Sequence, residues 1–461
     1  MTESRLPTAG SNVSGASVLP LHSDTARTAR LAKLRQDLHR HPELSWLEYR
    51  TTALIAARLQ ALGFTVRAGA ELYQQPPHNW PDATTRAAAW QRAAASLGSE
   101  QHWLQACRSG YSGVVATLDS GRPGPCVGYR FDMDALPIRE AASADHQPHR
   151  QGFASQHDGV MHACGHDGHV SAGLGLAEHL AQSLQQQPPG WSGKVHLFFQ
   201  PAEEVAGGGR YFAELPELAE VQRFASFHIG ITGRREIVLD ATWLAARIID
   251  VNLHGRSSHA GNAPQDGNNA LLAACTAIQN LYALPRHSGG MTRVNVGRLH
   301  SANAHNVISD HSSFRLEVRG SDDAVCDALL ARAEAVIHGA ASMHGCSAET
   351  ATVSRFEAQD NHPALVQQLQ AALLATGLAP QAVRISHRVP ASEDATSMSR
   401  VVQQNGGTAT HLLIGCDTRG GHHNPRFDFD EDLLPWAVDV LALVLHTDQQ
   451  VSASAETHRK R

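Results

Sequence analysis

The chain has 461 residues, of which 42% are hydrophobic, and its formal net charge is −6. This length exceeds one typical domain, so we expect two or three domains with substantial cores. The mild charge and the lack of a Lys/Arg block argue against a nucleic-acid partner, and no apolar run approaches the ~18 residues that a membrane-spanning helix needs. Seven scattered cysteines without paired spacing are typical of a reducing, cytoplasmic setting.

The amino-terminal part begins with a polar tail. Residues 1–30 are rich in Ser, Thr, Gly and Ala and lack a continuous apolar segment, so we predict a flexible tail and no signal peptide. An apolar stripe then predicts helices between residues 31 and 62. His39 and His41 are either metal ligands or polar residues near a helix end. Residues 71–110 have a different composition and predict a helical insert, either over a site or as a surface elaboration.

Several short apolar runs predict strands of an α/β sheet, at residues 113–118, 126–131, 194–199 and 224–229. Acidic residues or a histidine lie at the carboxyl ends of the last three runs: Asp132 and Asp134, Glu203 and Glu204, and His228. Because α/β sheets place their sites at the carboxyl ends of strands, these side chains are candidates for one site.

Residues 161–169, MHACGHDGH, combine three histidines, one cysteine and one carboxylate. This donor set suits a divalent transition metal such as Zn, Mn or Co. On a helix, Cys164 and His166 would point to different faces, so both reach one metal only if the chain is extended or turning. We therefore predict a strand-to-helix turn, with a helix starting at about Asp167. A nucleophilic Cys164 paired with a histidine is the alternative, and it leaves the other histidines without a role.

The pattern changes at about residue 245. Residues 245–357 have a strand-helix-strand-strand-helix-strand order, which predicts a small α+β domain of ferredoxin-like type. This domain interrupts a first domain of residues 31–244, whose pattern resumes over 358–461. His259 and Asn306 lie in loops of the insertion, where a surface role is the alternative to a functional one. A histidine pair at residues 422–423, on a glycine-rich turn, is another source of ligands.

An ordered set of motifs carries a family resemblance over about residues 30–446. The motifs are DLHRHPE (37–43), RFDMDALP (130–137), MHACGHDGH (161–169), QPAEE (200–204), SSHAGNAPQDGNNAL (257–271), HNVISD (305–310), SEDAT (392–396) and GHHNPRFDFDE (421–431). Together they resemble metallopeptidase family M20, in particular its aminoacylase-like amidohydrolases. The resemblance implies a di-metal exopeptidase-like α/β catalytic domain, with a mixed sheet flanked by helices, and an inserted ferredoxin-like lid or dimerisation domain.

The resemblance also implies an activity and partners. The expected reaction is metal-dependent hydrolysis of an N-acyl amino acid, and the narrower likeness points to p-aminobenzoyl-glutamate. The alternatives are a hippurate-like or indole-acetyl-like amino acid, or a non-catalytic subunit of a heteromeric hydrolase. The expected assembly is a homodimer or a complex with a related B subunit.

Roles follow for individual residues through the same resemblance. Two divalent cations, Mn or Zn, would be held by five ligands: Cys164, His166, Glu204, His228 and His423. Glu203 would be the general base. His259 would reach the substrate carbonyl in the active site of a partner subunit, and Asn306 would help to bind the substrate. Arg319, or alternatively Arg315, would meet the substrate carboxylate.

Three further features complete the comparison with the family pattern. Asp134 would hold the metal ligands in position without binding a metal itself. Val205-Ala206 follows the two glutamates where a glycine is usual, and Ser309 replaces a usual proline. Both departures bear on the geometry of the loops that carry them.

Overall fold

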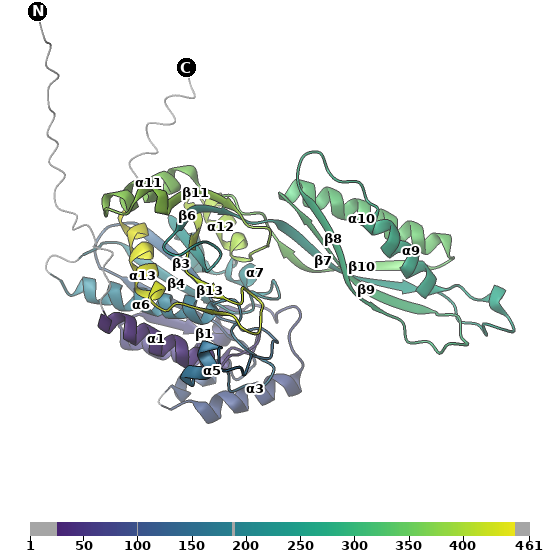
Figure 1. Cartoon of the computed structure of the whole chain (residues 1–461), viewed down its shortest axis with the longest axis horizontal. Helices are drawn as coiled ribbons and strands as arrows, with labels where there is room; N and C mark the ends of the chain where they lie inside the picture. The colour runs from purple at the N-terminus through teal and green to yellow at the C-terminus, as the bar shows by residue number, and fades with distance from the viewer. Residues whose placement is uncertain (1–24, 99, 187–189, 448–461) are drawn as a thin grey trace, which may run out of the picture.

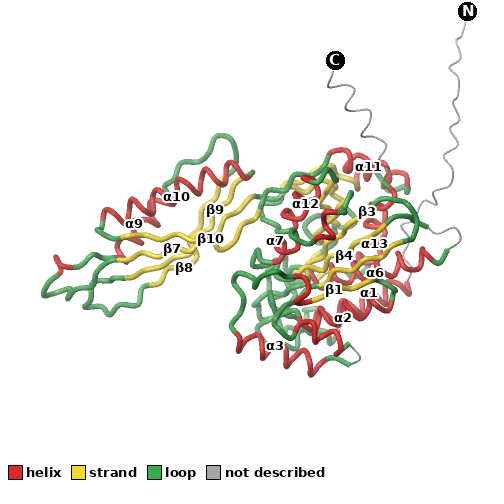
Figure 2. The backbone as a smooth tube through the Cα atoms, turned by 180° about the vertical axis from the view of Figure 1, so that it is seen from behind, coloured by secondary structure: helices red, strands yellow, loops and turns green. Residues whose placement is uncertain are grey.

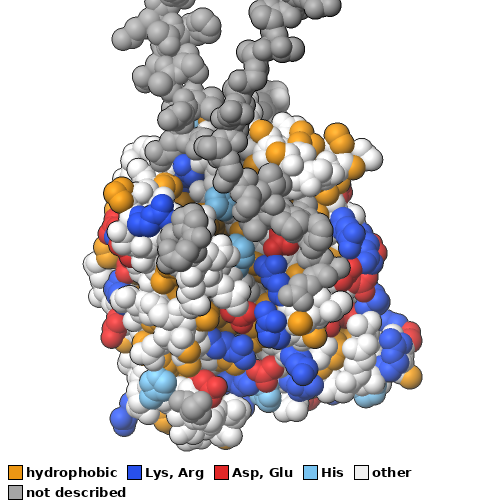
Figure 3. Space-filling view, turned by 90° about the vertical axis from the view of Figure 1, so that its left-hand side faces the viewer, with side chains coloured by type: hydrophobic (Ala, Val, Ile, Leu, Met, Phe, Trp, Pro, Cys, Tyr) orange, Lys and Arg blue, Asp and Glu red, His pale blue; other side chains and the backbone are white. Residues whose placement is uncertain are grey.

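The computed structural model describes residues 25–98, 100–186 and 190–447. Figure 1 shows two bodies, a larger domain and an inserted domain that projects from it. The larger one is called the catalytic domain below, after the role that the family resemblance implies. On the end of the catalytic domain that faces away from the inserted domain, basic and acidic side chains are interspersed (Figure 3). Within the described residues, no helix is both long and apolar enough to cross a membrane.

The catalytic domain is built on an eight-stranded mixed sheet in the order β1-β2-β4-β3-β5-β12-β6-β11. Its strands are β1 (Thr65–Ala68), β2 (Val114–Asp119), β3 (Cys126–Asp132), β4 (Lys194–Gln200), β5 (Arg223–Ile229), β6 (Ile237–Thr242), β11 (Val383–Arg388) and β12 (Thr408–Ile414). The central strands β4, β3, β5 and β12 are parallel to one another. They are mostly apolar and almost wholly buried, as expected for parallel strands that are covered on both faces.

Helices cover both faces of this sheet (Figure 2). One face packs against α1 (Thr25–Arg40), α2 (Tyr49–Ala61), α6 (His166–Leu184), α11 (Pro363–Ala375) and α13 (Leu433–Leu443). The other face packs against α7 (Gly208–Phe212), α8 (Pro216–Ala219) and α12 (Ala395–Gln404). Helix α6 approaches the sheet closely at Gly173, where an added Cβ would lie 2.8 Å from the ring of Phe199.

The predicted helical insert forms a separate small layer of the catalytic domain. It contains α3 (Ala83–Ser96) and α4 (Gln101–Leu104), between 3-10 turns at Gly69–Leu72 and Gln105–Cys107. Apolar side chains of the insert pack against Leu47, which lies just before α2, and against Tyr49 and Ala53 in the first two turns of α2. A short helix α5 (Gln147–Gln151) and a two-stranded hairpin of β13 (Thr418–Arg419) and β14 (Asp428–Phe429) lie in other loops of this domain.

The inserted domain has the strand and helix order that the sequence predicts. Its antiparallel sheet runs in the order β10-β7-β9-β8, with strands β7 (Ala245–His254), β8 (Thr292–His300), β9 (His311–Gly320) and β10 (Ser347–Phe356). Helices α9 (Ala270–Tyr282) and α10 (Asp323–Met343) pack on one face of it. Both helices begin at side-chain caps, since Asn269 and Asp322 each accept a bond from a backbone N–H three residues on. The predicted ferredoxin-like α+β class is therefore confirmed.

The structure corrects two details of the sequence analysis. Helix α1 begins at Thr25, so the last residues of the predicted tail are helical, while residues 1–24 lie outside the described range. The motif at residues 161–169 does not follow a sheet strand. Met161 makes only an isolated bridge with Leu136, and a loop leads from it to α6, which starts at His166.

Candidate active site

The loop before α6 brings the motif's cysteine and its candidate ligand His166 to the same place. Gly165 has φ of +95°, a left-handed conformation that glycine adopts without strain, and it lies directly before the helix. This turn directs Cys164 and His166 toward the end of β5. The Cys164 Sγ lies 3.4 Å from Nε2 of His228. The predicted turn is therefore present, although no strand precedes it.

A second loop, after β4, brings two glutamates to the same point. The carboxylate of Asp134 accepts hydrogen bonds from the backbone N–H groups of Glu203 and Glu204, each at 3.0 Å. Ser45 donates to the same carboxylate at 2.6 Å. The Glu204 carboxylate then lies 3.9 Å from Nε2 of His166. Asp134 thus positions both glutamates while its own oxygens are used by protein donors.

Backbone contacts set which nitrogen of each buried histidine is free. Nδ1 of His166 donates to the carbonyl of Asp134, and Nδ1 of His228 donates to the carbonyl of Ile229, both at 2.8 Å. A neutral imidazole that donates from Nδ1 keeps a lone pair on Nε2, which is the form that binds a metal. Both free nitrogens face the same cluster of ligand atoms.

The two histidines of the pair after β13 contact different partners. Nε2 of His422 donates to the carbonyl of Ile229 at 3.1 Å. Nε2 of His423 instead lies 3.4 Å from the carboxylate of Glu204. His423 has a left-handed φ of +57°, a conformation that is uncommon outside glycine, although histidine adopts it more often than most residues. Its half-exposed ring faces the site, as the prediction of His423 over His422 requires.

These five side chains fit a transition-metal centre. Nε2 of His166 and Oε1 of Glu204 are buried and have no hydrogen-bond partner among the described residues. An unpaired buried polar atom costs ~1–3 kcal/mol, and a bound cation would satisfy both atoms at once. Without a cation, burial and the neighbouring Glu204 and Glu203 carboxylates raise the pKa of the Cys164 thiol well above its usual value. This environment argues against a free nucleophilic thiolate and is consistent with a thiol that ionises on binding a metal.

A pocket of about 470 Å³ opens over this cluster. Its lining includes Glu203 and Glu393 from the catalytic domain and Arg319 and Phe356 from the inserted domain. Glu203 is 9% exposed, and burial, followed by the Glu393 and Glu204 carboxylates, raises its pKa well above the usual value. A carboxylate with a raised pKa next to the ligands is suited to accept and return a proton.

A buried ion network that no sequence motif predicted lies behind the pocket. Arg130 is fully buried in β3 and donates to Asp132 at 2.7 Å and to Asp394 at 2.8 Å. The same guanidinium lies 3.0 Å from Glu393. Burial is the largest influence on Glu393 and, against the effect of Arg130, raises its pKa to about 7. An arginine within an apolar, buried strand was the available signal, because a buried charge requires partners.

Two further motif residues are used to position others. Nδ1 of His169 donates to Asp132 at 2.5 Å, and its Nε2 accepts a bond from the backbone N–H of Ile229 at 3.1 Å. Both nitrogens are therefore occupied, so His169 fixes Asp132 and the end of β5. Asp167 is paired with Arg35 and with His39, each at 2.8 Å. His39 is thus a polar residue in a buried network on helix α1, the second of the two interpretations of this histidine.

The predicted residues of the inserted domain separate into two groups. Arg319 lines the pocket and donates to Glu317 at 2.9 Å, whereas Arg315 is paired with Asp250 at 2.7 Å. His259 and Asn306 do not line this pocket. They lie in adjacent loops of the inserted domain, joined by a hydrogen bond from the backbone N–H of residue 260 to the carbonyl of Asn306.

The ring of His259 has a defined tautomer. Its Nδ1 accepts hydrogen bonds from the backbone N–H groups of Gly261 and Asn262, at 3.2 and 3.1 Å. A neutral ring that accepts at Nδ1 carries its proton on Nε2. His259 therefore presents an N–H donor, which is the group needed to bind a carbonyl or oxyanion.

The two departures from the family pattern lie in well-formed loops. Ala206 has a left-handed φ of +52°, which explains why glycine is usual there, and its N–H donates to the carbonyl of Glu203 at 2.9 Å. Ser309 is buried, and its hydroxyl donates to the carbonyl of His311 at 3.0 Å. The glutamate loop therefore keeps its turn without the glycine.

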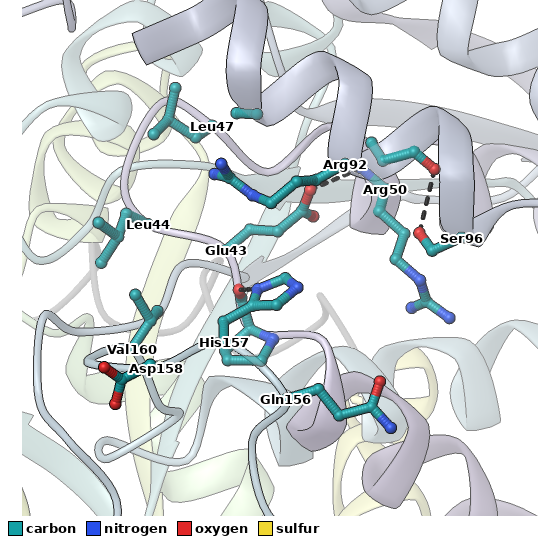
Figure 4. Close-up of a pocket in the computed structure, with 13 residues that line it drawn as sticks. Glu43, Leu44, Leu47, Arg50, Arg92, Ser96, Gln156, His157, Asp158 and Val160 are labelled. Atoms are coloured by element: carbon teal, nitrogen blue, oxygen red, sulfur yellow. Dashed lines mark hydrogen bonds between the residues drawn. The ribbon is translucent and has the colours of Figure 1, made fainter.

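A second hollow lies under the helical insert, away from the five ligands (Figure 4). It has a volume of about 400 Å³, and Glu43, Arg50, Arg92 and His157 are among the side chains around it. The Glu43 carboxylate is held by the backbone N–H of Arg50 at 2.9 Å, and Nδ1 of His157 donates to the carbonyl of Pro42 at 2.8 Å. The motif at residues 37–43 thus borders this hollow rather than the candidate active site.

Comparison with known proteins agrees with this geometry. Residues 128–447 match the model of peptidase family M20/M25/M40. The chain is 38% identical over 416 residues to the A subunit of the p-aminobenzoyl-glutamate hydrolase of Escherichia coli, covering 90% of this chain and 94% of the relative. It is also 38% identical over 416 residues, with the same coverage, to the indole-3-acetyl-aspartic acid hydrolase of Enterobacter agglomerans.

Solved structures give the same picture. An aminobenzoyl-glutamate utilization protein from Klebsiella pneumoniae superposes with a TM-score of 0.74 at 33% identity, covering 93% of this chain and 98% of that one. A Bacillus subtilis dinuclear metal binding peptidase of the M20 family has the same fold, with a TM-score of 0.65 at 24% identity over 92% of this chain and all of that one. The family match and these relatives show that the chain belongs to peptidase family M20/M25/M40.

Proposed function

We propose that this protein is a metal-dependent amidohydrolase that cleaves p-aminobenzoyl-glutamate to p-aminobenzoate and glutamate. The observation that carries the proposal is that four candidate ligands, Cys164, Glu204, His228 and His423, line one pocket together with Glu203. The fifth, His166, has a ligand atom within 4.8 Å of those of Cys164 and His228. The 38% identity to one chain of a named p-aminobenzoyl-glutamate hydrolase, over 90% of this chain, supports this substrate.

In this proposal two divalent cations, manganese or zinc, are held by the candidate ligands: Cys164, His166, Glu204, His228 and His423. When bound, such a pair supplies Lewis-acid chemistry that acidifies water and polarises the amide carbonyl. Asp134 keeps the glutamate loop in place, since its carboxylate accepts from the N–H groups of residues 203 and 204. Glu203 takes a proton from the attacking water and returns it to the leaving nitrogen.

The inserted domain acts as a lid in this proposal. Arg319 faces the pocket from β9 and would bind a substrate carboxylate by a charge-assisted hydrogen bond. His259 would donate its Nε2–H to the substrate carbonyl in a partner subunit's pocket, with Asn306 beside it. The protein then works as a dimer, either with a second copy or with a related B subunit, in the cytoplasm.

A second candidate substrate is an indole-acetyl amino acid. The equal 38% identity to the indole-3-acetyl-aspartic acid hydrolase supports it. Both substrates join an aryl-acyl group to an acidic amino acid, so the same Arg319 and metal ligands would serve either. A hippurate-like substrate lacks the second carboxylate and would use fewer contacts. The remaining alternative is a non-catalytic subunit.

Release of the free amino acid from these substrates by the purified protein tests the proposal. The protein is first stripped with a chelator and then reloaded with manganese or zinc. We expect glutamate release from p-aminobenzoyl-glutamate only in the reloaded samples. Faster release of aspartate from the indole-acetyl substrate would favour the second candidate. A metal-loaded protein that cleaves neither substrate, whether by itself or with a B subunit, would contradict the proposal.

A further inference from the structure

The parallel strands β4, β3 and β5 bring metal-binding side chains together at both of their ends. Their carboxyl ends lead to the candidate active site. At their amino ends lie Cys126, the first residue of β3, His196, the third residue of β4, and Glu220, shortly before β5. One ligand atom from each of these three residues lies within 4.8 Å of the other two.

The register of the sheet produces this arrangement. Gly128 in β3 is the pairing partner of His196 in β4, and Cys126 is the partner of Lys194. Side chains two apart on a strand share a face, so Cys126 and His196 project on the same side. Gly128 adds no side chain between them, and a Cβ there would lie only 3.0 Å from Val221.

The imidazole of His196 has the same unusual feature as that of His166. It is 2% exposed, its Nδ1 bonds to the hydroxyl of Thr117 at 2.8 Å, and its Nε2 has no hydrogen-bond partner among the described residues. When the hydroxyl accepts from Nδ1–H, the lone pair of Nε2 is left unused. That nitrogen lies 4.0 Å from a carboxylate oxygen of Glu220. A cation between them would satisfy a buried atom that is otherwise costly to leave unpaired.

The charges around this cluster set its affinity. Burial, followed by the Glu220 carboxylate, raises the pKa of Cys126 to about 12, so a metal must displace the thiol proton. The ammonium of Lys194 lies 2.6 Å from Glu220 and competes for that carboxylate. The Glu220 side chain is 53% exposed, so it has room to leave the lysine and turn toward the ring.

We propose that Cys126, His196 and Glu220 form a further zinc site, separate from the catalytic centre. A thiolate, an imidazole and a carboxylate are zinc ligands, and the thiolate disfavours magnesium and calcium. A seven-residue strand at ~3.3 Å per residue separates the two ends by roughly 20 Å, so the two sites do not share ligands. Zinc there would tie β3, β4 and the segment before β5 together and stabilise the domain.

The number of zinc ions per chain tests the site. The full-length protein and its variants are dialysed against the same buffered free zinc, and the bound metal is measured by mass spectrometry. We expect His196→Gln and Glu220→Gln to hold one zinc fewer than the wild type. Glu214→Gln, which changes an exposed carboxylate on the same segment, is the matched control and should keep the wild-type number. Because only a difference of one is used, the result does not depend on how many ions the catalytic centre holds.

Two further measurements sharpen the result. Lys194→Met removes the competing ammonium, so it should tighten the additional zinc and raise its occupancy at low free zinc. Anomalous diffraction at the zinc edge from wild-type crystals should show a peak between Cys126 Sγ and His196 Nε2. Equal zinc content in the wild type and Glu220→Gln, or a map with zinc at the catalytic centre and none between these atoms, would overturn the proposal. Glu220 is largely exposed, so its substitution should not prevent folding.

Discussion

Replacement of Glu203 by glutamine separates proton transfer from metal binding. The amide has nearly the same shape as the carboxylate, and the backbone N–H of residue 203 still donates to Asp134. The candidate ligands Cys164, His166 and Glu204 are unchanged, so the metal should stay bound. What is lost is a pocket carboxylate that lies beside the candidate ligands and has a raised pKa. A positioned general base contributes ~10²–10⁴-fold to the rate, or about 2.7–5.4 kcal/mol.

We therefore expect kcat of Glu203→Gln to fall by ~10²–10⁴-fold, with metal content and KM close to wild type. Amino acid release under saturating substrate gives kcat, and mass spectrometry gives the metal content of the same sample. Glu393→Gln is the comparison variant, because this buried carboxylate lines the same pocket but is bound to Arg130. It also removes one of the charges that raise the pKa of Glu203, so we expect a smaller loss of kcat than in Glu203→Gln. Turnover of Glu203→Gln within tenfold of wild type, with metal bound, would refute the role of Glu203.

Three other predictions concern substrate binding and stability. Arg319→Ala should raise KM at least tenfold with a smaller effect on kcat, because a charge-assisted hydrogen bond to the substrate is worth ~1.5–3 kcal/mol. The control Arg315→Ala should match wild type in steady-state kinetics. Arg130→Met should lower the free energy of unfolding in urea by ~3–5 kcal/mol, since it leaves buried carboxylates without their cation; a loss under 1 kcal/mol would contradict the network. Burial is the largest influence on Glu140 and opposes its ionisation, but the hydrogen bond and charge of His39, together with hydrogen bonds from Ser155 and His146, outweigh it and lower the pKa of Glu140 to about 2. Its stabilising contribution is therefore full above pH ~4.5 and is lost as the pH falls toward 2, so the stability difference between wild type and Glu140→Gln should shrink over that range.

The sequence predicted those elements that have a clear local pattern of apolar side chains. Strands β3, β4 and β5 match the mostly apolar runs predicted at residues 126–131, 194–199 and 224–229. Strands β1 and β11 were not predicted. Each is an edge strand of four to six residues with largely exposed or half-buried side chains. They are strands because a neighbour supplies their hydrogen bonds, which no local pattern records.

The residues of the candidate site fall into the same two groups: those that a local motif predicts and those that only the fold brings together. Cys164 and His166 could be predicted because they lie two residues apart in a dense motif. The contact of Arg130 with Asp394 joins residues that are 264 positions apart, so no local pattern brings them together. Similarly, the left-handed φ of Ala206 is a property of the folded turn, and only the family comparison hinted at it.

The order of strands in the catalytic sheet has a consequence for synthesis on the ribosome. Strand β12 lies between β5 and β6, although more than 150 residues separate it from either one in the sequence. The central sheet therefore cannot be completed before residue 414 has emerged from the ribosome. The loop that carries the candidate ligand His423 emerges later still. The inserted domain, residues 245–356, is continuous in sequence and can fold first, because domains fold as units during translation. Until β12 has emerged and paired with β5, the edge of β5 has no neighbouring strand. A ribosome stalled in this interval would therefore expose a strand edge that can aggregate or bind chaperones.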